Sequence, residues 1–175
     1  MGYKIIPLIK EEEIKKRVKE LGAEITKDYN GEQLLVVGIL KGSMPFTCSL
    51  IWEIENENMS IDYMCVSSYG SNTESSGIVR ILKDLDESIE GKNILIVEDI
   101  IDTGKTMDRL KELLSTRKPK SIKICTLLNK PSRRTVPVSI DYVGFEVENK
   151  FVVGFGLDYD QKYRQLKYIG EVEFD

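Results

Sequence analysis

Three carboxylates lie within five residues in the stretch IVEDIIDTGKT, residues 96–106. They are followed by a short turn made of Thr103, Gly104, Lys105 and Thr106. The turn resembles a nucleotide-phosphate loop, but Asp99 stands where a Walker A loop requires glycine. Backbone N–H groups at such a strand-to-helix turn, together with the positive end of the helix, can hold one phosphate. A monophosphate fits this short turn better than a triphosphate.

The three acids divide by their position in this stretch. Glu98 and Asp99 come at the end of a strand, where they could face ribose hydroxyls or a hydrated Mg²⁺ ion, which prefers oxygen ligands. Asp102 lies nearer the turn and is free for proton transfer. Helix capping alone would account for one acid at such a turn but hardly for three. The pattern therefore favours a functional site over a merely structural turn.

The sequence contains no histidine. This excludes Ser-His-Asp and Cys-His nucleophile systems and imidazole metal ligands, so catalysis must use carboxylates, lysine, tyrosine or a bound metal. The net charge of −4 gives no general attraction for a polyanion, and no local basic patch is obvious. We therefore expect no nucleic-acid partner.

The 175 residues, of which 41% are hydrophobic and 31% charged, predict one folded domain over residues 1–175. Cys48, Cys65 and Cys125 lie far apart in apolar stretches, which favours buried thiols over disulfides and fits a reducing cytoplasm. The N-terminal stretch lacks the features of a signal peptide, and no apolar run is as long as a membrane span. We expect a cytoplasmic protein with no membrane partner.

Helices and strands are predicted to alternate along the chain. Ile14, Val18, Leu21 and Ile25 follow helical spacing and predict an amphipathic helix over 11–25. Further helices are expected over 46–54 and over 105–118, the last closed by Pro119. Strands are expected over 32–40, 59–69, 78–85, 92–99, 121–129 and 141–147, followed by the apolar stretch 151–160 and a short polar tail. This order predicts an α/β fold with a parallel, doubly wound sheet and helices on both faces.

The motif VEDIIDTGKT resembles the phosphoribosyl diphosphate signature of the type I phosphoribosyltransferases, in its hypoxanthine-guanine form. The resemblance covers nearly the whole chain. It implies a central, mostly parallel sheet flanked by helices, a flexible hairpin lid at about 66–80, and a small purine-binding hood. The hood would be formed mainly by residues 150–175 together with the N-terminal residues.

The resemblance also implies roles for the acidic stretch. Glu98 and Asp99 would bind the ribose hydroxyls and help to hold Mg²⁺. The turn from Asp102 to Thr106 would bind the 5′-phosphate, with Asp102 as the proton acceptor. The acidity of this phosphate site is then explained, because it would recognise a ribose phosphate with its metal.

Three further parts of the sequence match diphosphate-binding and lid positions of the family. Lys41 and Gly42, in the turn LKGS, match a diphosphate loop that often has a cis peptide before the lysine; read alone, they are equally consistent with an ordinary tight turn. Arg164 matches a diphosphate-binding arginine. Ser68 and Tyr69 match a lid pair, although without the family a flexible surface hairpin is the simpler interpretation.

The purine site is implied by residues in the last third of the chain. Lys130 matches the lysine that donates to the purine 6-oxo group, Phe151 the aromatic that stacks on the base, and Val152 the residue whose backbone reads it. Asp158 matches an acid near the purine 2-position that helps to order a second Mg²⁺. As isolated residues these would pass for surface charges or packing. Arg133 and Arg134 receive no defined role.

The implied activity is Mg²⁺-dependent transfer of the phosphoribosyl group from 5-phosphoribosyl 1-diphosphate to N9 of hypoxanthine or guanine, in purine salvage. A homodimer or homotetramer is implied as well. Two alternatives stay open. One is a regulator of the same fold that senses phosphoribosyl compounds and binds RNA, which would need a basic surface. The other is a transferase that prefers xanthine, adenine or uracil.

Overall fold

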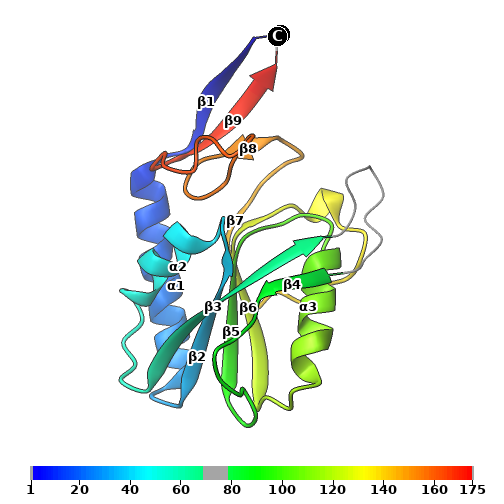
Figure 1. Cartoon of the computed structure of the whole chain (residues 1–175). Helices are drawn as coiled ribbons and strands as arrows, with labels where there is room; N and C mark the ends of the chain where they lie inside the picture. The colour runs from blue at the N-terminus through cyan, green and yellow to red at the C-terminus, as the bar shows by residue number, and fades with distance from the viewer. Residues whose placement is uncertain (1, 69–78, 175) are drawn as a thin grey trace.

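The computed structural model describes residues 2–68 and 79–174, in which two sheets stand one above the other (Figure 1). The larger sheet has six strands in the order β4-β3-β2-β5-β6-β7. Its strands are β2 (Leu34–Leu40), β3 (Met59–Ser68), β4 (Val79–Lys83), β5 (Asn93–Ile101), β6 (Ser121–Asn129) and β7 (Tyr142–Glu146). All neighbours are parallel except β4, which pairs antiparallel with β3 at one edge.

Helices cover both faces of this sheet, which confirms the predicted α/β class. They are α1 (Glu11–Tyr29), α2 (Met44–Ile51) and α3 (Lys105–Ser115), with a 3₁₀ turn, η1 (Pro131–Arg133), after β6. Helices α1 and α2 pack on one face and α3 on the other (Figure 1). The β-helix-β connections place the ends of β2, β5 and β6 at one edge, where such folds bind ligands.

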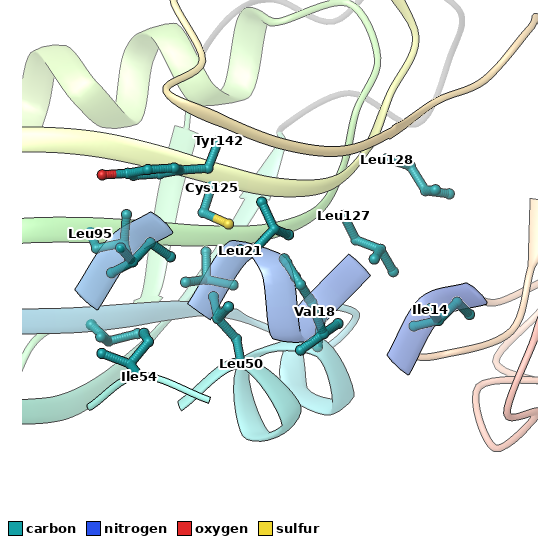
Figure 2. Packing of buried hydrophobic residues seen from close by; sticks show 14 of the residues in the cluster. Ile14, Val18, Leu21, Leu50, Ile54, Leu95, Cys125, Leu127, Leu128 and Tyr142 are labelled. Carbon is teal, nitrogen blue, oxygen red and sulfur yellow. The ribbon is translucent and has the colours of Figure 1, made fainter. Parts of the chain in front are cut away.

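Successive side chains of the central strands point to opposite faces of the sheet, so each strand contributes to two layers of packing. Leu34 and Leu95 face α1 and α2, whereas their neighbours Leu35 and Ile94 face α3. Figure 2 shows the first of these layers, in which Val18, Leu21, Leu50, Leu95, Cys125 and Leu127 are packed together. Strands buried on both faces read as continuous apolar runs, which is why the sequence predicted them well.

Helix α1 is longer than its apolar spacing predicted. The four residues that carried the prediction are all buried, and the helix continues through a polar turn to the buried Tyr29. Asn30 then ends it in a left-handed conformation, with its N–H donated to the carbonyl of Thr26 at 2.9 Å. Helix α2 begins two residues earlier than predicted because Pro45 is accommodated in its first turn, and α3 ends three residues earlier.

The small sheet joins the two ends of the chain. It consists of β1 (Tyr3–Ile9), β9 (Ile169–Phe174) and β8 (Val152–Val153), in the order β1-β9-β8 and all antiparallel. The apolar stretch 151–160, to which the sequence assigned no element, forms a strand only at β8. Phe155, Asp160 and Tyr163 have positive φ angles, so the chain turns repeatedly instead of extending. The tail, which the sequence described only as short and polar, forms β9 and buries Ile169 and Val172.

The predicted lid lies largely outside the described residues. The backbone of Ser68 ends β3, and β4 begins at Val79, but Tyr69 belongs to the part of the chain that the structure leaves undescribed. The lid and the roles of this pair therefore stay predictions. Within residues 2–68 and 79–174, no helix combines the length and apolarity required to cross a membrane.

Candidate active site

A cavity of about 190 Å³ opens at the carboxyl end of β5. It is lined by the end of the strand, by the following turn and by the start of α3: Glu98, Asp99, Ile100, Ile101, Asp102, Thr103, Gly104, Thr106 and Met107. All three acids of the sequence motif therefore face one hollow, together with the turn that was predicted to hold a phosphate.

Glu98 and Asp99 form a crowded acidic pair in this cavity. Burial raises the pKa of Glu98 well above its usual value, and the negative charge of Asp99 raises it further. Burial also raises the pKa of Asp99, although the positive charge of Arg164 opposes that shift. Two carboxylates in a desolvated site repel each other unless a cation or hydrogen-bond donors compensate them. The pair is thus suited to a positively charged or hydroxyl-rich ligand.

The turn after β2 touches this pair directly. A β-carbon built on Gly42 would lie 1.7 Å from Oδ2 of Asp99, so any larger residue would have to displace this carboxylate or the turn. The Leu40–Lys41 peptide is cis, which is the conformation that the family resemblance implied. Gly156, from the segment after β8, packs on the other side of the turn, since a β-carbon on it would lie 1.9 Å from the carbonyl oxygen of Gly42. Three separate segments therefore meet at Gly42.

Arg164 lies next to Gly156, beside the turn that carries Gly42. Its Nη1 donates to the carbonyl of Gly156 at 2.8 Å, and its Nη2 pairs with Oδ1 of Asp158 at 2.9 Å. Its charge also opposes the rise that burial causes in the pKa of Asp99. The arginine and Asp158 thus belong to the neighbourhood of the acidic pair, but Asp158 is neutralised by Arg164.

The turn from Asp102 to Thr106 forms part of the cavity wall. Gly104 has φ +86°, a left-handed conformation that glycine adopts without steric penalty, and α3 begins at the next residue. Gly104 at the N-cap has no side chain to cap this helix, and Oγ1 of Thr103 accepts the N–H of Lys105 only at a long 3.4 Å. The helix N-terminus therefore presents its positive end to the cavity, as a phosphate-binding turn requires.

Asp102 lies at the rim of the cavity and pairs with a residue to which the sequence gave no role. Its Oδ1 is 3.3 Å from Nε of Arg133, and both side chains are about half exposed to solvent. Arg134 approaches from the same segment, and its Nε donates to the carbonyl of Asp102 at 3.0 Å. In the sequence, only the run of two arginines could have indicated these contacts with Asp102. It was not decisive, because a solvent-exposed basic turn has the same composition.

Lys130 is buried beside the site although its sequence context suggested a solvated turn. Only 8% of it is exposed, and its Nζ donates to the carbonyl of Lys150 at 2.6 Å. Burial lowers the pKa of the ammonium, and the negative charge of Asp102 opposes that shift. The ammonium therefore stands between the segment that precedes Phe151 and the acid at the rim.

Phe151 is exposed while its neighbour Val152 is buried. The Phe151 ring meets Tyr159 edge-on at a centroid distance of 5.4 Å, and Phe174 at 6.3 Å. An aromatic ring that is 47% exposed yet fixed at its sides by other rings offers a firm surface for a planar ligand.

The three predicted metal ligands do not form a single cluster. Within residues 2–68 and 79–174, no group of three acidic or cysteine side chains is arranged to enclose an ion. Glu98 and Asp99 nevertheless fit Mg²⁺, because that ion is usually held by one or two carboxylates, with substrate oxygens and water completing its shell. Burial raises the pKa of both acids, and a cation bound beside them would favour their charged forms.

The chain resembles known proteins over almost its whole length. A model of the phosphoribosyl transferase domain matches residues 8–160. The chain is 57% identical over 163 residues to the hypoxanthine-guanine phosphoribosyltransferase of Bacillus subtilis (strain 168), covering 93% of this chain and 90% of that protein.

Two further relatives agree with this match. The identity to the hypoxanthine phosphoribosyltransferase of Escherichia coli (strain K12) is 49% over 174 residues, covering 98% of this chain and 97% of that one. The crystal structure of a hypoxanthine phosphoribosyltransferase from Staphylococcus aureus superposes with a TM-score of 0.93 at 51% identity, covering 95% of this chain and 90% of that one. Because the domain model spans most of the chain and these relatives match nearly end to end, the protein belongs to the phosphoribosyl transferase domain family.

Proposed function

We propose that this enzyme transfers the phosphoribosyl group of 5-phosphoribosyl 1-diphosphate to N9 of hypoxanthine or guanine, yielding IMP or GMP and diphosphate in purine salvage. The observation that carries the proposal is the half-buried pair of Glu98 and Asp99 next to the turn from Asp102 to Thr106. An acidic pair beside a phosphate-binding turn suits a ribose 5-phosphate with its metal. The names of the relatives in Bacillus subtilis and Escherichia coli support the purine as acceptor.

Glu98 and Asp99 would bind the ribose hydroxyls and Mg²⁺, and the backbone N–H groups of the turn would bind the 5′-phosphate. When bound, Mg²⁺ would supply positive charge to the diphosphate leaving group. Lys41 and the backbone of Gly42 would hold that diphosphate with Arg164, whose charge already reaches Asp99. Asp158 would help to order a second Mg²⁺ after exchanging its ion pair with Arg164 for that ion.

The purine would lie on the exposed ring of Phe151. The backbone of Val152 and the ammonium of Lys130 would read its edge, with the ammonium leaving the carbonyl of Lys150 to donate to the 6-oxo group. Asp102, freed from Arg133, would accept the proton from N7 as N9 attacks C1 of the ribose. Since the sugar carries positive charge in the transition state, fixed charges rather than a covalent nucleophile would account for the rate.

Exposed apolar side chains support an assembly of identical subunits. Met44 and Trp52 at the ends of α2, Ile61 on β3 and Leu82 on β4 are at least 43% exposed, and β3 and β4 are paired strands. Large apolar residues of this kind commonly mark interaction surfaces. We infer a homodimer or homotetramer that uses this flank. The three free cysteines fit a cytoplasmic location.

The proposal is tested by incubating the protein with 5-phosphoribosyl 1-diphosphate, Mg²⁺ and each of hypoxanthine, guanine, xanthine, adenine and uracil, and by following nucleotide formation. We expect activity with hypoxanthine and guanine and little with adenine, whose 6-amino group is a donor facing the donor Lys130. EDTA should abolish turnover and added Mg²⁺ should restore it. Adenine as the best substrate, or full activity in metal-free buffer, would overturn the assignment.

A further inference from the structure

Three successive carbonyl groups, those of Ile101 at the end of β5 and of Asp102 and Thr103 in the phosphate-binding turn, are tied to one neighbouring segment, residues 130–136. The carbonyl of Ile101 accepts the N–H of Lys130 at 3.0 Å. The carbonyl of Thr103 accepts the N–H groups of Thr135 and Val136 at 3.0 and 3.2 Å. Between them, the carbonyl of Asp102 accepts Nε of Arg134 at 3.0 Å. We call residues 130–136 the strap.

These bonds determine where the amide groups of the turn point. In a planar trans peptide, the carbonyl of one residue and the N–H of the next point in opposite directions. The cis peptide of the described chain lies elsewhere, at Leu40–Lys41. Because the strap holds the carbonyls of Ile101, Asp102 and Thr103, the N–H groups of residues 102–104 point away from the strap. These residues also line the cavity, so the strap orients their N–H groups towards it.

Arg134 is the one side chain among these contacts that joins the turn to the sheet. Its Nη2 donates to Oδ1 of Asn129 at 2.5 Å, at the end of β6, and lies 3.4 Å from the carbonyl of Ile101. Its Nε reaches the carbonyl of Asp102 from the same planar group. A guanidinium supplies several donors in fixed directions, whereas a lysine ammonium is a single point on a flexible stem. This geometry therefore needs arginine.

The strap also presses on the turn at its glycine. A β-carbon on Gly104 would lie 2.8 Å from the carbonyl oxygen of Val136 and 2.9 Å from Cδ of Arg134. The turn thus has no room to shift towards the strap, while the hydrogen bonds prevent it from moving away. Both kinds of contact fix the same conformation of the turn.

We propose that Arg134 is a positioning residue for the 5′-phosphate site: it holds the carbonyl of Asp102 so that the amides of the turn face the phosphate. This inference rests on the proposed function, in which that turn binds the 5′-phosphate of 5-phosphoribosyl 1-diphosphate. Arg134 acts through the backbone. It differs in this from Arg133, whose side chain meets the carboxylate of Asp102.

The test compares Arg134→Met and Arg134→Lys with Arg109→Met, a control on the exposed side of α3 whose guanidinium pairs with Glu112. Steady-state kinetics give kcat and the KM for each substrate. We expect both Arg134 variants to raise the KM for 5-phosphoribosyl 1-diphosphate about tenfold or more, as the loss of a charged hydrogen bond predicts. The KM for hypoxanthine should change much less, and the control should match the unmodified enzyme.

The outcomes separate this inference from the proposed function. A merely structural role would reduce the folded fraction and hence kcat, and would leave the KM for 5-phosphoribosyl 1-diphosphate unchanged; that result would overturn the inference. If Arg134→Met does not fold, Arg134→Lys, which keeps the charge and most of the stem, decides the matter by the same KM. An unmodified enzyme that forms no nucleotide would instead contradict the proposed function.

Discussion

Gly42 and Asp99 are in such close contact that a β-carbon on the glycine would stand 1.7 Å from a carboxylate oxygen of the acid. The two residues come from different segments of the chain. Gly42 lies in the turn after β2, and Asp99 lies near the end of β5. Under the proposed function, this contact places the diphosphate loop directly against the metal-binding and ribose-binding acids. A ligand that spans both would bring the metal and its leaving group together.

Gly42→Ala should therefore disable the site without unfolding the protein. The methyl group would displace Asp99 or the turn, and a small displacement of positioning groups can reduce kcat/KM by about a hundredfold. Gly91→Ala is the control, because nothing lies within 4 Å of its β-carbon position. Gly91 has a positive φ of 72°, which Gly42 does not, so this control adds backbone strain but no clash. Equal kcat/KM values for the two variants would contradict the importance of the contact.

Asp102→Asn should lower kcat by about 10² to 10⁴, the usual contribution of general acid–base help. Asparagine keeps the size of the side chain and can still face Arg133, but it does not accept the purine proton at neutral pH. Binding of 5-phosphoribosyl 1-diphosphate, measured by calorimetry, should persist. The control is Asp86→Asn, which changes an exposed carboxylate in the loop between β4 and β5. Near-normal kcat with both purines would mean that another group is the base.

Glu98→Gln should raise the thermal stability of the ligand-free protein at pH 7. The pKa of Glu98 is higher in the folded state than in the unfolded state, so the folded protein binds its proton more tightly. The free energy of unfolding therefore falls as the pH rises from the unfolded pKa through the folded one. Glutamine carries no charge, so the free energy of unfolding of the variant does not fall with pH for this reason.

Melting temperatures measured at several pH values test this predicted pH dependence of the free energy of unfolding. The advantage of Glu98→Gln should be present at pH 7 and should disappear below about pH 4, where glutamate is protonated in both states. The same variant should bind 5-phosphoribosyl 1-diphosphate with Mg²⁺ more weakly. A lower melting temperature than that of the unmodified protein at pH 7 would show that the buried acid stabilises the fold.

Lys130→Met should weaken discrimination between 6-oxo and 6-amino purines. Methionine keeps the apolar stem but loses the donor, so we expect the KM for hypoxanthine to rise about tenfold to a hundredfold. The low activity with adenine should not fall further, since a repulsive donor is removed. Lys118→Met, in the turn that follows α3, serves as the control. An unchanged KM for hypoxanthine would remove Lys130 from the purine site.

The sequence by itself determined the parts of this protein that depend on neighbours along the chain. The helix at Ile14, Val18 and Leu21 could be predicted because one turn of a helix brings these residues to the same face. The buried strands β2 and β5 could be predicted from their apolar runs. The acidic motif was recognisable for the same reason, since its three carboxylates and its glycine occupy one strand end and one turn.

Only the tertiary structure decided the contacts between residues far apart in the chain. Tyr3 pairs with Phe174 in the small sheet, Gly42 meets both Asp99 and Gly156, and Arg134 holds the turn at Asp102. None of these contacts leaves a periodic signal, because each depends on how separate segments are packed and not on the spacing of residues within one segment. A short edge strand, a glycine and a basic turn each look ordinary in sequence. Their roles arise from hydrogen bonds and close packing that exist only once the chain has folded.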